Sequence, residues 1–147
     1  FYIMKKIVSG FLALFALLIL ANCSTQKTTT STMIEREWML VEFQDFSKEV
    51  MVANKANMNL THVKSTSKFS AKMGCNNMFG TAIFGKNGTV KFSEVGSTMM
   101  FCDQAMELEA AFGKALPTMT KYKTEGHYLI LSDNNGNAMK FLAADWD

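Results

Sequence analysis

Apolar and polar residues alternate with a period of two along most of the chain after residue 36, as in β-strands that bury one face. The second predicted strand places Met58, Leu60 and His62 on one side, so His62 is expected to be partly buried. Asn87-Gly88 predicts a hairpin turn, because both residues tolerate positive φ. The pattern predicts about eight short strands, within residues 38–43, 57–63, 68–73, 79–84, 90–92, 118–124, 128–131 and 138–142.

One segment has helical spacing instead. Ala105, Leu108, Phe112 and Ala115 recur every three or four residues, which predicts a helix over residues 103–116 that ends before Pro117. The elements together indicate a β-rich (α+β) domain. We expect an antiparallel, partly closed barrel-like sheet of about eight short strands, with one helix packed against it or plugging one end.

The first residues have the pattern of a secretory signal peptide. Lys5 and Lys6 precede an apolar run over residues 7–21. As a helix this run would span roughly 22 Å, less than the ~30 Å hydrocarbon core of a bilayer, which disfavours a retained transmembrane helix. The run ends in Leu20-Ala21-Asn22-Cys23.

This ending resembles the lipobox of bacterial lipoproteins, although Asn22 stands where a small residue is usual. The resemblance implies that Cys23 receives a diacylglyceryl group and becomes the first residue after cleavage. The alternative is an ordinary cysteine in a secreted soluble protein. We therefore expect a lipoprotein signal peptide over residues 1–22, a lipidated cysteine with a flexible polar tether over 23–35, and a folded domain over 36–147.

Net charge argues against nucleic acid as a partner. The chain has 15 basic and 13 acidic residues, and two of the basic ones are Lys5 and Lys6 of the leader. The remaining 15 − 2 = 13 basic residues balance the 13 acidic ones, whereas a nucleic-acid-binding domain normally has a basic excess. The expected partners are instead a membrane, through the N-terminal lipid, and an envelope protein or small ligand.

The body of the chain carries a set of landmark residues. They are Trp38-x-Leu40, Gly74-Cys75-Asn76 with Gly80, Ser97-Thr98-Met99-Met100-x-Cys102, Glu109 with Phe112, Tyr122, Leu129-x-Leu131, Met139-x-Phe141 and Asp145-Trp146. With these landmarks the body resembles the META domain of the HslJ-like bacterial envelope lipoproteins. The resemblance implies a compact β-rich domain on the extracytoplasmic side of the cell envelope, with no defined reaction and with a stress-related role in some members.

Cys75 and Cys102 remain once Cys23 is assigned to the lipid. An even pair in an oxidising compartment favours a disulfide, and closing that loop contributes about 3 to 4 kcal/mol in the chain-entropy model. The alternative is two separately buried thiols that act as small apolar groups.

A sharper alternative for the same cysteines is a Cu(I) site. Met73 and Cys75 lie two residues apart, as do Met100 and Cys102, so four sulfur ligands would converge if the two segments pair. The ordinary interpretation is that the 12 methionines of the chain fill its core.

The sequence predicts a non-enzymatic protein without a cofactor. His62 and His127 are its two histidines, and neither stands in a known catalytic motif. The best candidates for a binding surface are the loops over residues 74–77 and 97–101, where glycine and polar residues flank strands. The candidate binding residues are Gly74, Asn76, Asn77, Ser97 and Thr98.

Mass spectrometry of the mature N-terminus tests the lipoprotein prediction. We expect protein recovered from cells to begin at Cys23 and to carry the mass of a diacylglyceryl group. An intact protein in the cytosol that begins at Met4 and has no lipid mass would contradict it.

Overall fold

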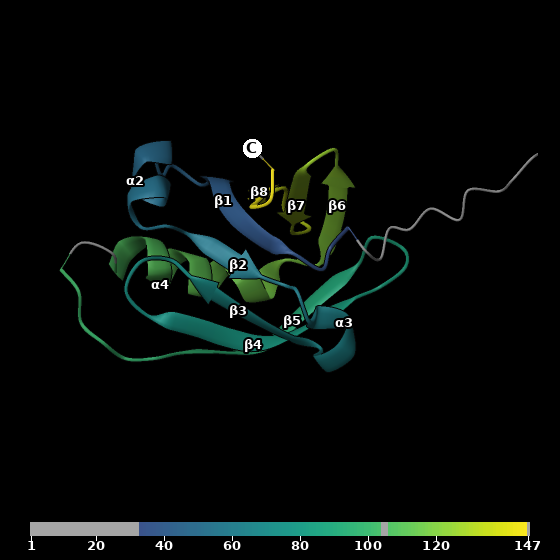
Figure 1. Ribbon diagram of the computed structural model, residues 1–147, viewed down its shortest axis with the longest axis horizontal. Coiled ribbons are helices and arrows are strands. Elements are labelled where there is room, and N and C mark those ends of the chain that lie inside the picture. Colours follow the sequence, from purple (N-terminus) through teal and green to yellow (C-terminus); the bar gives the residue numbers. More distant parts are fainter. Residues whose placement is uncertain (1–32, 104–105, 147) are drawn as a thin grey trace, which may run out of the picture.

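Eight antiparallel strands form one continuous sheet in the order β5-β4-β3-β2-β1-β8-β7-β6 (Figure 1). The computed structural model describes residues 33–103 and 106–146. The β-rich, antiparallel architecture expected from the alternating pattern is therefore confirmed. The strands are β1 (Glu37–Phe43), β2 (Asn57–Asn59), β3 (Lys68–Lys72), β4 (Asn77–Phe84), β5 (Val90–Ser97), β6 (Lys121–Glu125), β7 (Tyr128–Ser132) and β8 (Ala138–Ala143).

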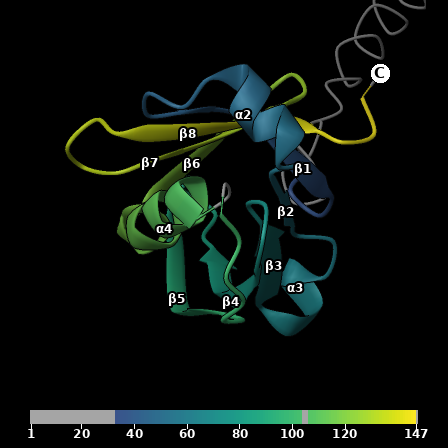
Figure 2. The same ribbon diagram turned by 90° about the vertical axis from the view of Figure 1, so that its left-hand side faces the viewer.

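The sheet curls on itself until its two edges meet at one corner. Figure 2 shows β6, β7 and β8 above, β3, β4 and β5 below, and β1 and β2 joining the two halves. Beside the β4–β5 turn, the Val90 N–H donates to the Thr120 carbonyl at 2.9 Å, and the Tyr122 N–H donates to the Gly88 carbonyl at 2.7 Å. These contacts close the half-barrel at the start of β5 and β6, as the prediction of partial closure requires.

Helix α4 (Met106–Ala115) lies between the two halves of the curled sheet (Figure 2). Its Leu108 and Phe112 side chains are buried, and the Phe112 ring meets Phe43 and Phe141 edge-on at centroid distances of 6.1 and 6.4 Å. A 3₁₀ turn, η2 (Leu116–Thr118), follows and contains Pro117. The predicted helix is confirmed over Met106–Ala115, with Leu108 and Phe112 on its buried face, whereas its expected start at residue 103 is a turn and Ala105 lies outside the described residues.

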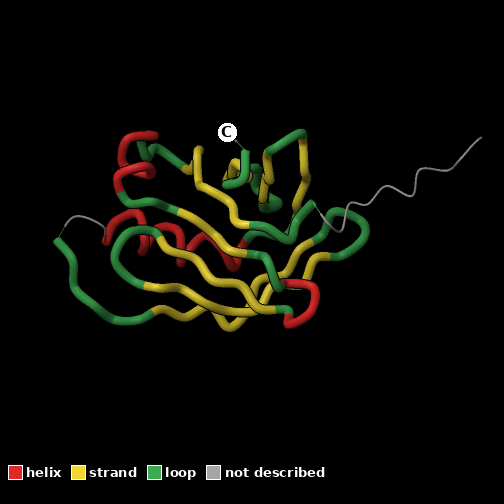
Figure 3. Tube along the Cα trace, in the orientation of Figure 1, coloured by secondary structure: helices red, strands yellow, loops and turns green. Residues whose placement is uncertain are grey.

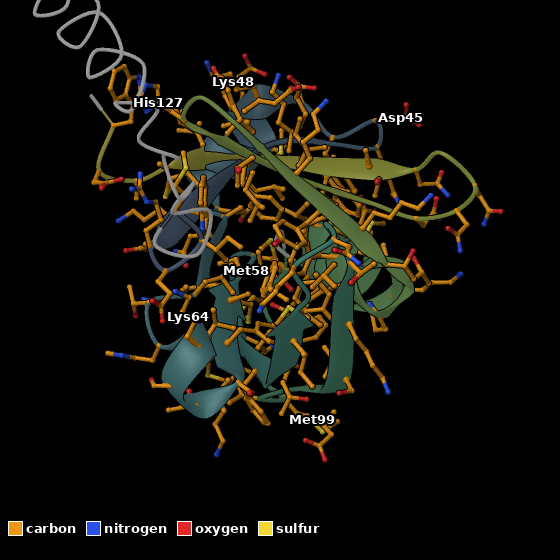
Figure 4. All side chains as sticks on the ribbon, turned by 90° about the vertical axis from the view of Figure 1, so that its right-hand side faces the viewer. Asp45, Lys48, Met58, Lys64, Met99 and His127 are labelled. Atoms are coloured by element: carbon orange, nitrogen blue, oxygen red, sulfur yellow. A yellow bond between two sulfur atoms is a disulfide. The ribbon has the colours of Figure 1, made fainter. Side chains whose placement is uncertain are left out.

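The core is made by the inward residues of every strand together with this helix face. Met58 lies near its centre (Figure 4). The flexible thioether side chain fills irregular space between elements, which is the ordinary role of methionine. Six methionines are buried in this way: Met51, Met58, Met73, Met78, Met119 and Met139.

Two short helices were not predicted. Helix α2 (Lys48–Ala53) begins after Ser47, whose side chain accepts a hydrogen bond from the Val50 N–H. Helix α3 (Val63–Thr66) follows β2 directly, so the predicted strand over 57–63 ends at Asn59. The Asn59 side chain accepts hydrogen bonds from the Thr61 N–H and hydroxyl groups and turns the chain there. Because these helices have six and four residues, helical periodicity in the sequence cannot reveal them.

The turn after β2 corrects the prediction for His62. His62 lies at the N-cap of α3 and is exposed, because the strand alternation that would bury it stops before it. Its backbone carbonyl, not its ring, has the structural role here and accepts hydrogen bonds from the Ser65 and Thr66 hydroxyls.

The folded part of the chain begins before the expected boundary at residue 36. Ile34 is buried, and its carbonyl accepts a hydrogen bond of 2.9 Å from the Trp38 indole N–H. The predicted signal peptide, Cys23 and most of the tether lie outside the described residues. Within residues 33–103 and 106–146, no helix has the length and apolar character needed to cross a bilayer.

Candidate functional site

The connection between β5 and α4 forms a long loop at one end of the molecule (Figure 3). We call residues 98–102 the pinned loop, because the turn over residues 74–77 holds it from the side. Figure 4 shows Met99, on this loop, and His127 at opposite ends of the domain. The sequence predicted that these two loops form a surface, and the structure brings them together.

The Asn76 side chain pairs with the pinned loop as a neighbouring strand would. Its Oδ1 atom accepts hydrogen bonds from the Met100 N–H at 2.7 Å and from the Thr98 hydroxyl at 2.8 Å. Its Nδ2 group donates to the Met100 carbonyl at 3.0 Å. The loop backbone is therefore held on both sides of Met99.

Glu109 of α4 holds Asn76 in turn. One carboxyl oxygen of Glu109 accepts from the Asn76 backbone N–H and the other accepts from Asn76 Nδ2, both at 2.7 Å. Both residues are buried, with exposed fractions of 2% for Asn76 and 6% for Glu109. Such groups are tolerated inside a protein only when they are hydrogen-bonded, and among the described residues no buried side-chain nitrogen or oxygen lacks a partner.

A glycine and a disulfide complete the attachment. Gly74 has φ = 135°, a conformation that side chains disfavour, and it turns the chain so that Cys75 and Asn76 face the loop. Cys75 and Cys102 form a disulfide with Cα atoms 5.9 Å apart, as predicted. The loop is thus attached by a covalent bond at Cys102 and by hydrogen bonds at Thr98 and Met100.

Three side chains of the pinned loop are exposed to solvent although they are apolar. Met99 is 98% exposed, Met100 54% and Phe101 82%. A run of three exposed large apolar residues is unfavourable in water and is typical of an interaction surface. The side chains of Asn76 and Thr98 hold the loop in place through hydrogen bonds. The side chains that a partner would meet on the predicted loops are therefore those of Met99, Met100 and Phe101.

A groove of about 340 Å³ lies between β5 and α4. Ser97 before the loop and Met106 after it both line the groove, which continues between β5 and α4 past Ala110. Small residues keep it open: a Cβ atom on Gly113 would lie only 3.0 Å from the Met78 methyl carbon.

The remaining predicted binding residues have clear positions. The Asn77 backbone pairs with Thr98, through an N–H donated to the Thr98 hydroxyl at 3.1 Å and a carbonyl that accepts the Thr98 N–H at 3.0 Å. The Asn77 side chain is exposed, and Ser97 is exposed at the end of β5 opposite Met78. Gly74 and Thr98 shape and hold the two loops.

The disulfide leaves the predicted Cu(I) site without thiolate ligands in this structure. Cys75 and Cys102 are bonded to each other, Met73 is fully buried, and Met100 is largely exposed. The four-sulfur site therefore stays a prediction for reduced protein alone. Among the described residues, no group of three His, Cys, Asp or Glu side chains is arranged to hold a metal ion.

The groups with clearly shifted pKa values have local structural causes away from the loop. A hydrogen bond from the Asn137 side chain, reinforced by backbone N–H groups, lowers the pKa of Asp133 in the β7–β8 turn. A hydrogen bond to Glu42 raises the pKa of Lys140 on β8. Each shift follows from a contact that organises a turn or a strand pair.

The role of Glu109 was not predicted from the sequence, in which this residue is a landmark of the family resemblance and its burial was not expected. Glu109 lies four residues after Ala105 and three before Phe112, so it falls on the apolar stripe of the predicted helix. A carboxyl group on that stripe requires a polar partner, and this spacing was the available signal.

The chain belongs to the META domain family, whose model matches residues 31–146. The resemblance drawn from its sequence landmarks is therefore confirmed. No curated protein sequence matches the chain significantly.

Solved structures share the fold at low sequence identity. A protein from Burkholderia xenovorans, solved by NMR, is 21% identical with a TM-score of 0.61, and the match covers 79% of this chain and 86% of that one. A second NMR structure is 18% identical with a TM-score of 0.59, covering 76% and 92% of the two chains. A DUF4847 family protein from Bacteroides vulgatus is 15% identical with a TM-score of 0.51, covering 80% and 98%.

The variant N76D tests the buried contact with Glu109. It places a second carboxyl group where Asn76 Nδ2 now donates at 2.7 Å. Two ionised carboxyl groups repel at this distance, so the pKa of the introduced group rises above its unfolded value of about 3.9. The variant therefore keeps most of its stability below about pH 4 and loses it as the pH rises, with a deficit of roughly 3 kcal/mol at neutral pH.

Urea unfolding at several pH values measures this deficit, and N77D is the matched control. Asn77 is the next residue and its side chain is exposed, so N77D should change stability by less than about 0.5 kcal/mol at every pH. Equal behaviour of N76D and N77D would show that the buried contact does not stabilise the domain.

Proposed function

We propose that this chain is a lipid-anchored, non-enzymatic binding protein of the bacterial cell envelope, and that the pinned loop is its docking surface. The observation that supports this most directly is the contrast within the loop. Its backbone is held by Asn76 and the disulfide, while Met99 and Phe101 are almost fully exposed.

Rigid presentation of apolar side chains favours binding on energetic grounds. Burying a large apolar side chain against a partner contributes about 1.5 to 3 kcal/mol. Ordering a flexible backbone residue costs about 1 to 2 kcal/mol, and a loop that is already held avoids most of this cost. The apolar side chains are unfavourably exposed in the free protein. Their burial therefore contributes favourable binding free energy when a partner covers the loop and the groove.

The position of the loop is compatible with an N-terminal anchor. The described chain begins beside its C-terminal strand: the Glu37 carbonyl accepts from the Ala144 N–H, and the His127 carbonyl accepts from the Ala143 N–H. The loop lies at the end opposite His127. The chain from Cys23 to Met33 is ten residue steps long and would span about 35 Å if fully extended. A lipid on Cys23 would therefore leave the loop free to face away from the membrane that holds the chain.

The envelope location is supported by the signal-peptide pattern and by a disulfide that suits an oxidising compartment.

A binding role is also consistent with the cluster of hydrogen-bonded polar side chains beside the loop. Asn76, Thr98 and Glu109 direct their hydrogen bonds at one another and at the loop backbone, which leaves them to hold a surface in place. The stress-related role implied by the family resemblance stays a prediction.

Site-specific photocrosslinking in cells tests the docking surface. A photoreactive amino acid replaces Phe101 in the full chain, and a matched variant carries it at Val52, an exposed apolar residue of α2. We expect a discrete adduct from position 101 and none from position 52, because only the loop is proposed to contact the partner.

Binding measurements with the purified adduct partner complete the test. F101A should weaken its binding about tenfold or more, since a central aromatic anchor contributes at least 1.4 kcal/mol, whereas V52A should leave it unchanged. Equal adducts from both positions, or equal affinity of F101A and wild type, would refute the docking role of the loop.

A further inference from the structure

We propose that Met99 is a site of reversible oxidation, at which a peroxide converts the thioether to a sulfoxide and changes the pinned loop from apolar to polar without unfolding the domain. The chemical selectivity follows from the structure alone. The consequence for binding rests on the proposed function.

Exposure separates Met99 from the other methionines. Met99 is 98% exposed, Met100 54% and Met33 38%, whereas six methionines of the core are at most 4% exposed. Oxidation of a thioether requires that the oxidant reach the sulfur, so rates follow exposure. Met99 is therefore the first described methionine to react, followed by Met100 and Met33.

Cysteine does not compete for the oxidant in the described part of the chain. A thiolate would react with peroxide before a thioether, but Cys75 and Cys102 are joined in a disulfide. Cys23 lies outside the described residues. The exposed thioether at the tip of the pinned loop is thus the most accessible reduced sulfur within residues 33–103 and 106–146.

The reaction balances with peroxide as the oxidant. A sulfur lone pair of Met99 attacks one peroxide oxygen, the O–O bond breaks, and the departing hydroxide takes up a proton as water. The sulfur loses two electrons and the peroxide gains them. A dithiol reductase reverses the step: two thiols become a disulfide, the sulfoxide returns to the thioether, and its oxygen leaves as water.

The loop geometry allows this change without loss of the fold. The hydrogen bonds that hold the loop come from the Thr98 hydroxyl and the Met100 N–H, on either side of Met99, and the Met99 side chain lies in solvent. The oxygen of a sulfoxide at Met99 would contact water, so the surrounding protein would not have to rearrange. A sulfoxide at a buried methionine such as Met58 or Met73 would instead place a polar group in the core.

Peptide mass mapping during limited hydrogen peroxide treatment of the full chain tests the selectivity. We expect Met99 to gain an oxygen about tenfold or more faster than the core methionines, with an unchanged melting temperature at the stage where Met99 alone is modified. The proposal is overturned by a Met99 rate equal to that of the core methionines, or by a melting temperature that falls with Met99 oxidation.

Retention on a hydrophobic-interaction column measures the change in surface. Oxidised wild-type protein should elute earlier, and treatment with methionine sulfoxide reductase and a dithiol should restore its retention. Under the limited treatment that modifies Met99 alone in the wild type, M99L should show no such shift, and the matched control M33L should behave as wild type. A shift that persists in M99L would place the responsible sulfur elsewhere and contradict the proposal.

Photocrosslinking from position 101 separates this inference from the proposed function. We expect peroxide to lower the yield of the adduct in step with the fraction of Met99 sulfoxide, and methionine sulfoxide reductase with a dithiol to restore it. An adduct that survives Met99 oxidation overturns the regulatory consequence while the docking role stands. If no adduct forms from position 101 in untreated cells, the docking role fails, and the mapping experiment alone decides whether Met99 is the oxidation site.

Discussion

A buried hydrogen-bonded pair, Asn76 with Glu109, connects three parts of this domain that are far apart in sequence. Glu109 belongs to α4, the helix between the two halves of the curled sheet, and Asn76 belongs to the turn between β3 and β4. The Asn76 side chain in turn holds the loop after β5. Removing both groups from water is unfavourable unless every hydrogen bond is made. The loop conformation is therefore coupled to the packing of the helix against the sheet.

At this one site the usual distribution of residues is reversed. Asn76 and Glu109 are buried, where they fix the loop geometry, and the large apolar side chains of Met99, Met100 and Phe101 contact water. The disulfide and the Asn76 hydrogen bonds restrain neighbouring positions of the same loop. Two restraints on one segment mean that its exposed side chains have a defined direction, as a docking surface requires.

Much of the fold was predictable because strand alternation is a repeated signal. The inward residues of β3 and β8 follow it closely, those of β5 follow it from Val90 to Phe92, and the hairpin at Asn87-Gly88 needed only local turn chemistry. The short helices were not predictable, because four to six residues show no helical period. The exposure of His62 and the burial of Ile34 depend on where the chain turns and on a contact with the Trp38 indole.

The candidate site was predictable in location but not in chemistry. The sequence brought attention to residues 74–77 and 97–101 through glycine and polar residues, and these segments do lie together. The Asn76 side chain faces inward because it donates a hydrogen bond to Glu109, which lies 33 positions later in the chain and in a different element. A contact over this distance cannot be derived from local pattern, and so Asn76 was assigned to binding although it holds the loop.

Amide hydrogen exchange of Met100 tests the central claim most directly. The Met100 N–H is bonded to buried Asn76 Oδ1, whereas the neighbouring Met99 side chain stands in solvent. If the buried pair fixes the loop, the Met100 amide exchanges at least about tenfold more slowly than that of Met99, relative to their unfolded rates. Equal exchange of the two amides would mean that the loop opens freely and that the pair does not hold it.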